Sequence, residues 1–228
     1  MPMNANVPVS DASSRSLLLL SGGHDSIALA VLCRPSACLT IDYGQRPVVG
    51  EMRAAKAVVQ ALALDWHQFQ VDLSSIGSGL LHDDGAGAHA DADAATAFKG
   101  GAPVEGAPSP EWWPYRNQLL VSLAAAWALP RGFDELVIGS VAPDGERHKD
   151  GTPGFYQRLN ELVSYQEGGI RVTAPAIGLS SAELIRASGV TDAVLGFAHS
   201  CHVAAYPCGM CPGCRKHEDV IQASGRFQ

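Results

Sequence analysis

The chain has 228 residues, of which 46% are hydrophobic and 17% charged, which is enough apolar sequence for one sizeable core with an appendage. Its net charge of -7 argues against broad, non-specific binding to nucleic acid, because such binding needs a basic surface. No apolar stretch approaches the roughly 20 residues of a membrane-spanning helix, so neither nucleic acid nor a membrane is an expected partner.

The two ends of the chain differ in character. Residues 1–15 are expected to form a disordered tail, since the first 14 residues lack the basic region and the long apolar segment of a secretory signal. Four of the six cysteines crowd into residues 201–214. That crowding favours metal binding in a reducing, cytoplasmic location over a framework of disulfides.

Short apolar strands alternate with helical patterns along residues 16–200, which we expect to form one domain. The expected strands span residues 17–20, 37–42, 68–73, 135–139 and 169–174. The expected helices span residues 26–32, 49–64, 118–129, 155–164 and 180–187. A capping box formed by Ser180 and Glu183 opens the last helix. This alternation predicts an α/β fold, a parallel sheet with flanking helices.

A glycine-rich turn lies between the first strand and the first helix. It reads Ser21-Gly22-Gly23-His24-Asp25-Ser26, and we call it the glycine turn. Gly22 and Gly23 let the backbone approach a ligand, and the free N–H groups of the following helix attract an anion. The serines add hydroxyl donors, and Asp25 is a carboxylate suited to a magnesium–phosphate complex. The turn lacks the spacing and the lysine of a Walker loop. We expect a phosphate site here; the alternative is a serine-capped helix that follows a strand.

Residues 77–111 interrupt the alternation. They are rich in Gly, Ala, Asp and Pro and contain few large apolar side chains. Such a segment is either a mobile flap over the site or a disordered insertion, and the sequence leaves both open.

The C-terminal segment, residues 201–228, carries the cysteine cluster. Its members are Cys201, Cys208, Cys211 and Cys214. Four thiolates at this spacing, with no open position, describe a structural tetrahedral zinc site. A disulfide would need an oxidising compartment, and a redox site would need only one pair. Cys33 and Cys38 lie in apolar sequence and are expected to be core residues.

The glycine turn and the cysteine cluster, taken with two further sequence motifs, make the chain resemble the 7-cyano-7-deazaguanine synthase family. This family is the QueC-like branch of the PP-loop ATP pyrophosphatases. The two further motifs are Asp42-Tyr43-Gly44-Gln45-Arg46 and Tyr115-Arg116-Asn117. The glycine turn alone identifies only the PP-loop superfamily. The Asp-Tyr-Gly-Gln-Arg string and the cysteine cluster narrow the resemblance to this family, over roughly residues 16–222.

The resemblance implies a HUP-type, Rossmann-like domain, the cofactors ATP, Mg²⁺ and Zn²⁺, and a homodimer. It also implies an ATP-dependent C–N ligase reaction. ATP adenylates the carboxylate of 7-carboxy-7-deazaguanine and releases pyrophosphate, ammonia converts the acyl adenylate to an amide, and a second activation by ATP dehydrates the amide to the nitrile. N–H donors and Mg²⁺ that bind the departing pyrophosphate stabilise charge that grows in the transition state.

Site residues follow from the resemblance by position. The glycine-turn residues Ser21, Gly22, Gly23, His24, Asp25 and Ser26 are implied to bind pyrophosphate and Mg²⁺, and Asp42, Tyr43 and Gln45 to lie near the nucleotide. Arg116 and Asn117 are implied to contact substrate or phosphate, since an arginine can bind either with two parallel hydrogen bonds. The catalytic candidates are Ser21, Asp25, Ser26 and Arg116. Alternatively, Asp42 and Gln45 are turn residues and Arg116 forms a surface ion pair.

The loop of residues 139–153 departs from the family pattern. Family members carry Gly-Val-Asn and then Asp-Tyr-Ser-Gly-Tyr-Pro-Asp-Cys-Arg around the substrate. Here the two aspartates are kept as Asp144 and Asp150, both candidate substrate ligands, whereas Val141 replaces the asparagine. Residues 146–149 are charged or titratable and replace most of the rest.

This departure allows more than one interpretation. The loop is either a diverged but equivalent pocket, or the mark of a paralogue that passes the activated deazaguanine to an amine of a partner protein. Relatives of the second kind are similar to components of anti-phage defence systems. A third hypothesis is a non-catalytic nucleotide-binding scaffold, against which the intact glycine turn argues.

Overall fold

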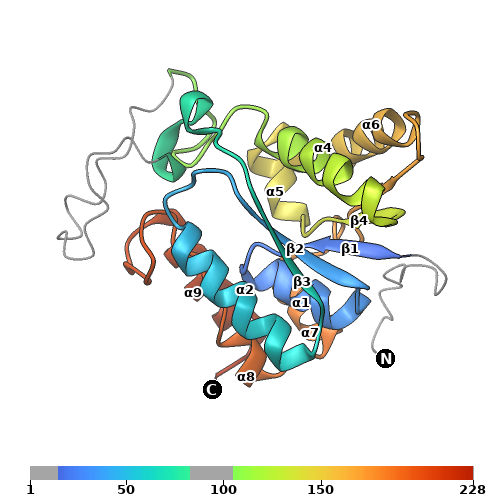
Figure 1. Cartoon of the computed structure of the whole chain (residues 1–228). Coiled ribbons are helices and arrows are strands. Elements are labelled where there is room, and N and C mark those ends of the chain that lie inside the picture. Colours follow the sequence, from blue (N-terminus) through green and yellow to red (C-terminus); the bar gives the residue numbers. More distant parts are fainter. Residues whose placement is uncertain (1–14, 83–104, 228) are drawn as a thin grey trace.

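The computed structural model describes residues 15–82 and 105–227 (Figure 1). Five strands form one parallel sheet in the order β3-β2-β1-β4-β5. They are β1 (Ser16–Leu19), β2 (Ala37–Asp42), β3 (Trp66–Gln70), β4 (Glu135–Val137) and β5 (Arg171–Thr173). This confirms the predicted Rossmann-like parallel sheet. Because the chain leaves β1 towards β2 on one side and later adds β4 on the other, the switch point of the sheet lies between β1 and β4.

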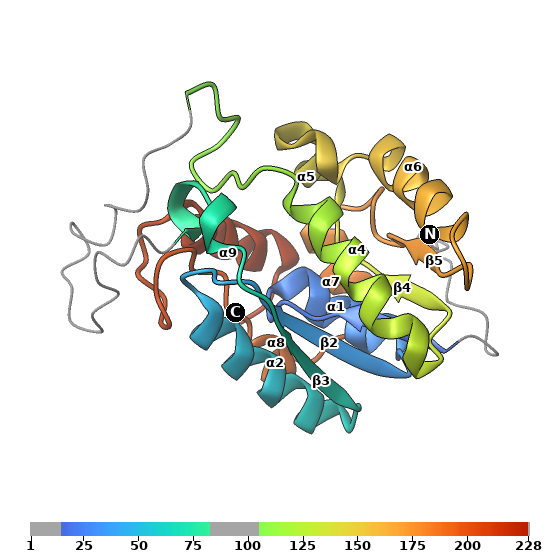
Figure 2. The same cartoon turned by 45° about the horizontal axis from the view of Figure 1, so that its top comes forward.

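Helices cover both faces of the sheet (Figure 2). They are α1 (His24–Cys33), α2 (Val48–Leu62), α4 (Arg116–Ala128), α5 (Ala142–Arg147), α6 (Pro153–Ser164), α7 (Ser181–Ser188), α8 (Asp192–Leu195) and α9 (Pro212–Ser224). Single 3₁₀ turns lie at Ser74–Ile76, Gly79–Leu81, Leu129–Arg131 and Lys149–Gly151. No helix in the described ranges is both long and apolar enough to cross a membrane.

Two apolar clusters, one on each face, hold the layers together. Alternate residues of a strand point to opposite faces, so Leu17 joins the cluster with α4 and α6, and Leu18 joins the cluster with α1, α2, α7 and α8. Both leucines are fully buried. The alternation explains why the strands are apolar on successive positions, as expected for a sheet covered on both faces.

The third strand begins earlier than the predicted range of residues 68–73. Trp66 pairs opposite Cys38, and its indole Nε1 donates to Thr40 Oγ1 at 2.9 Å. At the other end, Val71 N still donates to Asp42 O at 2.8 Å, although the regular strand ends at Gln70. Contacts with the neighbouring strand, which local sequence does not reveal, therefore set its start.

Three helices, α5, α8 and α9, were not predicted. Helix α5 has only six residues and contains Gly145, which disfavours a helix in isolation. In α9 the N-cap is Cys211, whose sulfur accepts a hydrogen bond from Cys214 N, so the start of this helix depends on the cysteine cluster.

Both ends of the predicted 77–111 insert belong to the packed structure. Leu80 N donates to Pro110 O at 2.8 Å, and Ser78 Oγ donates to Trp112 O. Leu80 and Leu81 are buried. A flap or a disordered insertion over residues 77–111 stays a prediction. Its centre, residues 83–104, and the predicted tail except Arg15 lie outside the described residues.

Candidate active site

The glycine turn lies beyond the carboxyl end of β1, at the switch point of the sheet, where ligands bind in this class of fold. Gly22 has φ +78°, and a Cβ on it would lie 2.7 Å from Glu51 O and 2.9 Å from Ala54 Cβ. Only glycine fits this conformation and this space. Gly23 is the N-cap of α1 and has no side chain to cap the helix, so the first N–H groups of α1 suit an anion.

The two serines of the glycine turn lie together. Ser26 Oγ donates to Gly23 O at 2.9 Å and lies 3.2 Å from Ser21 Oγ. Both line a cavity of about 340 Å³ and an adjoining one of about 250 Å³. Gly139 and Ser140, which follow the neighbouring strand β4, also line the larger cavity. The cavities therefore join at the predicted phosphate site and are large enough for a small-molecule ligand.

Arg116, the first residue of α4, lines both cavities. Burial opposes its charge, but Tyr43, Asp150 and Glu51 surround the guanidinium and raise its pKa. Burial likewise raises the pKa of Tyr43 to about 12, so its hydroxyl stays protonated. Arg116 is thus a charged donor inside the site and not a surface ion pair.

Glu51, on α2, also lines both cavities, although no sequence motif had indicated it. Gln45 orients it: Gln45 Nε2 donates to Glu51 Oε2 at 2.7 Å and to Ile41 O at 3.1 Å, while Gln45 Oε1 accepts from Tyr43 N at 2.8 Å. Burial raises the pKa of Glu51 to about 7. A carboxyl group that titrates near neutral pH can exchange a proton with a ligand.

Asp42 is held within the turn after β2. Its Oδ1 accepts from Gly44 N at 3.1 Å and its Oδ2 from Gln70 Nε2 at 3.2 Å. Tyr43 and Gln45 line the larger cavity, but Asp42 is not among the residues that line it. A contact of Asp42 with the nucleotide stays a prediction.

The 139–153 loop folds against α4. Asn117 Nδ2 donates to Asp150 O at 2.9 Å, so Asn117 fixes the backbone of this loop. Asp144 Oδ2 accepts from Val141 N at 3.1 Å, and its Oδ1 lies 3.2 Å from Lys216 Nζ of α9. Asp144 faces the larger cavity, and the charge of Asp150 acts on Arg116.

Two of the titratable residues of the 139–153 loop pair with the far end of the insert. Arg147 Nη2 forms an ion pair with Oε1 of the buried Glu111, and Ser109 Oγ lies 3.3 Å from His148 Nε2. Glu111, Arg147 and His148 all line the larger cavity. The charges that replace the family residues therefore join this loop to residues 109–111.

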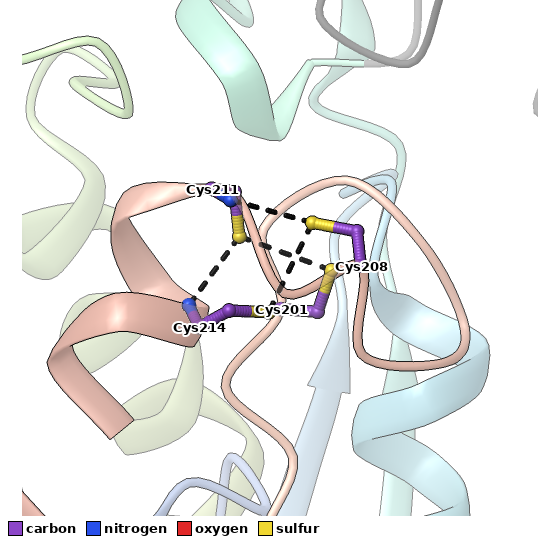
Figure 3. A group of neighbouring side chains, drawn as sticks. All are labelled: Cys201, Cys208, Cys211 and Cys214. Atoms are coloured by element: carbon purple, nitrogen blue, oxygen red, sulfur yellow. Dashed lines mark hydrogen bonds between the residues drawn. The ribbon is translucent and has the colours of Figure 1, made fainter. Parts of the chain in front are cut away.

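The cysteine cluster converges on one point (Figure 3). Its four sulfurs lie within 4.8 Å of one another, and the pairs Cys208–Cys214 and Cys201–Cys211 are each 3.9 Å apart. Zinc bound tetrahedrally with Zn–S bonds of about 2.3 Å needs sulfurs about 3.8 Å apart. The donor set and its spacing therefore fit zinc. All six cysteines are free thiols, without disulfides.

Backbone N–H groups around the cluster stabilise thiolates. His202 N and Cys214 N both donate to Cys211 Sγ at 3.4 Å. With the hydrogen bond from the Cys201 thiol as the largest cause, they lower the pKa of Cys211 below its usual value. The Cys211 sulfur is thus favoured as the thiolate, the form of cysteine that binds a metal cation.

A family model described as "Queuosine biosynthesis protein QueC" matches residues 15–225. The chain belongs to the QueC family. The 7-cyano-7-deazaguanine synthase of Ralstonia pickettii (strain 12J) is 32% identical over 225 residues, which are 92% of this chain and 95% of the relative. The synthases of Synechococcus sp. (strain RCC307) and Chlorobaculum tepidum are 31% and 28% identical, over 94% and 92% of this chain and 97% and 93% of theirs.

In this QueC-family chain, the two residues before the C-terminal segment lie directly on the glycine turn. His199 N donates to Gly22 O at 2.9 Å, and Ser200 Oγ lies 3.4 Å from Nδ1 of His24. Burial lowers the pKa of His24, which keeps its ring neutral. The residues that lead into the cysteine cluster therefore pack against one wall of the predicted phosphate site.

The structure brings most of the predicted site residues together. The residues of the predicted site that line one or both cavities are Ser21, Gly23, His24, Asp25, Ser26, Tyr43, Gln45, Arg116, Asn117 and Asp144. Residues that the sequence did not single out complete the walls: Glu51, Glu111, His202 and Lys216. Of these, Lys216 had a detectable signal, because it lies two residues after the last cysteine of the cluster.

Proposed function

We propose that this protein is an ATP-dependent 7-cyano-7-deazaguanine synthase, which converts 7-carboxy-7-deazaguanine and ammonia to the nitrile. The observation that carries the proposal is the glycine turn, which opens onto a cavity of about 340 Å³ lined by Arg116. The named relatives support it because they match this chain along nearly its whole length. Activation of a carboxylate by ATP needs an anion site for the phosphates, and beside it a cation that orients the carboxylate. The glycine turn can serve as the anion site and Arg116 as the cation.

The glycine turn is proposed to bind the β- and γ-phosphates of ATP through the first N–H groups of α1 and the hydroxyls of Ser21 and Ser26. Asp25 Oδ1 is buried and accepts no hydrogen bond from any described residue, which suits a cation ligand. Magnesium held there would neutralise phosphate charge when bound. Donors already in place at the departing pyrophosphate lower the barrier without reorganisation.

Arg116 is proposed to hold the reacting carboxylate, since a guanidinium binds a planar carboxylate with two parallel hydrogen bonds. Glu51 is proposed to accept the proton that ammonia releases as it attacks the acyl adenylate. Its pKa of about 7 and its position where the two cavities meet both suit this role. The reaction needs no covalent nucleophile.

The alternatives from the sequence gain no support. The relatives are named as synthases, and nothing in the comparisons or in the cavity favours a protein amine as acceptor, a role in defence, or a scaffold without catalysis. The 139–153 loop keeps Asp144 in the cavity wall, which suits a diverged but equivalent pocket. A homodimer and a cytoplasmic location remain proposals that follow from the family, and sedimentation velocity tests the first.

Pyrophosphate release by the purified protein tests the proposal. We expect release from Mg·ATP to depend on added 7-carboxy-7-deazaguanine, and to be lost in Asp25→Asn while zinc content is kept. Asp219→Asn, an exposed carboxylate on α9, is the matched control and should behave as wild type. Release that is indifferent to the acid would instead leave a nucleotide-binding protein without this activity.

A further inference from the structure

A cation from the C-terminal helix lies against the glycine turn. Residues 21–26 contain no lysine or arginine, yet phosphate sites usually include one. Lys216 Nζ lies 3.8 Å from Oδ2 of Asp25, the acidic residue of the turn, and 3.2 Å from Oδ1 of Asp144. Lys216 also lines both cavities, and its side chain is about one-third exposed. It is therefore buried enough to be held in place and open enough to meet a ligand.

The position of Lys216 is set by the cysteine cluster. Helix α9 starts at Pro212, with Cys211 as N-cap and Cys214 in its first turn, so two members of the cluster fix its first residues. Gly213 tightens this arrangement, because a Cβ there would overlap the Ser200 carbonyl and the His202 ring. Lys216 follows Cys214 by two residues and projects from this anchored turn to the glycine turn.

The contacts of Lys216 are those of a ligand-binding cation. A bridge between two carboxylates is a poor source of stability where the ammonium is partly solvated. Asp144 lines the larger cavity and Asp25 the adjoining one, and Lys216 lines both, so a phosphate group that enters either cavity competes with a carboxylate for the same ammonium. The other carboxylate oxygen of Asp25, Oδ1, accepts no hydrogen bond from any described residue. Asp25 can therefore bind a metal cation when the ammonium group of Lys216 moves to the phosphate.

We propose that Lys216 is the phosphate-contacting cation of the ATP site, supplied by α9 in place of a lysine in the loop. Before the nucleotide binds, Asp25 and Asp144 hold the ammonium group at the glycine turn. This inference rests on the proposed use of ATP at this site. It also gives the cysteine cluster a function beyond stability, because the cluster holds α9 where Lys216 reaches the phosphates.

Binding of Mg·pyrophosphate, measured by calorimetry without any deazaguanine, tests the assignment. A hydrogen bond between charged groups contributes enough that Lys216→Met should weaken binding by about 10- to 100-fold. Arg215→Met removes the same charge from the neighbouring, exposed position of α9 and should stay within about twofold of wild type. Lys216→Arg, which keeps a cation, should restore most of the affinity.

Two further measurements distinguish a direct contact between Lys216 and phosphate from a structural role of Lys216. Zinc content and the affinity for adenosine, which carries no phosphate, should be unchanged in Lys216→Met; a parallel loss of either would show a structural role and overturn the assignment. Equal pyrophosphate affinity in Lys216→Met and wild type would also overturn it, while leaving the proposed activity intact. If wild type itself fails to bind Mg·pyrophosphate and ATP, the proposed activity fails together with this inference.

Discussion

Gly22→Ala tests how the glycine turn is built. Alanine at φ +78° costs about 1–2 kcal/mol because the side chain meets its own backbone in the left-handed region. The new Cβ would also lie 2.7 Å from Glu51 O and 2.9 Å from Ala54 Cβ. Helix α2 would have to move away, and such overpacking costs a further 1–3 kcal/mol, roughly. We expect a total destabilisation of about 2–5 kcal/mol.

Gly189→Ala is the matched control for this variant. Gly189 has φ +66°, but a Cβ there would meet nothing within 4 Å, so this substitution carries only the backbone cost. The free energy of unfolding of both variants is measured by urea denaturation. The affinity for Mg·pyrophosphate should fall about tenfold or more in Gly22→Ala and stay unchanged in Gly189→Ala, since only the first displaces the phosphate site. Equal destabilisation of the two variants would refute the claim that the turn is closed by contact with α2.

Three further predictions concern single side chains around the site. Burial raises the pKa of Glu51 to about 7, so the folded state binds its proton more tightly than the unfolded state. The stability that this proton contributes is lost as pH rises from about 4.5 through 7. Glu51→Gln should therefore gain stability relative to wild type between pH 5 and 8, by about 2–3 kcal/mol, and a pH-independent difference in urea unfolding would contradict this. Cys211→Ser should lose the bound zinc and lower the melting temperature, whereas Cys33→Ser should keep the metal; emission spectrometry that finds full zinc in Cys211→Ser would exclude the four-thiolate site. Arg147→Met leaves the buried Glu111 without its ion pair and should cost about 1 kcal/mol, with most of it recovered in Arg147→Lys; no change in unfolding would mean that this contact contributes nothing.

Local patterns predicted the sheet and placed the candidate phosphate site on it. The apolar run before Gly22 and Gly23, together with the helical pattern after them, indicated a strand, a turn and a helix, and the repetition of this alternation along the chain predicted a parallel sheet. The positions of Ser21 and Ser26 in the cavity wall follow from this order. The spacing of the cysteine cluster was equally informative, because metal-ligand geometry is encoded over a few residues.

The rest of the site depends on contacts between distant segments. Glu51 reaches the cavity only because Gln45 orients it, and Glu111 because residues 109–113 return to the edge of the sheet beside residues 78–80. Lys216 enters because the cysteine cluster sets the start of α9. No periodicity along the sequence contains such information, so an acidic residue on a helix has the pattern of an ordinary surface residue. Only its spacing from the last cysteine distinguishes Lys216 from such a residue.

Mass spectrometry of the products tests the central claim most directly. The purified protein is supplied with 7-carboxy-7-deazaguanine, Mg·ATP and ammonium, and lysate proteins are present as competing acceptors. We predict that the acid is converted to free 7-cyano-7-deazaguanine, with AMP and pyrophosphate released and no deazaguanine attached to protein. An accumulated amide without nitrile, or a protein that carries the deazaguanine, would contradict the assignment as a 7-cyano-7-deazaguanine synthase.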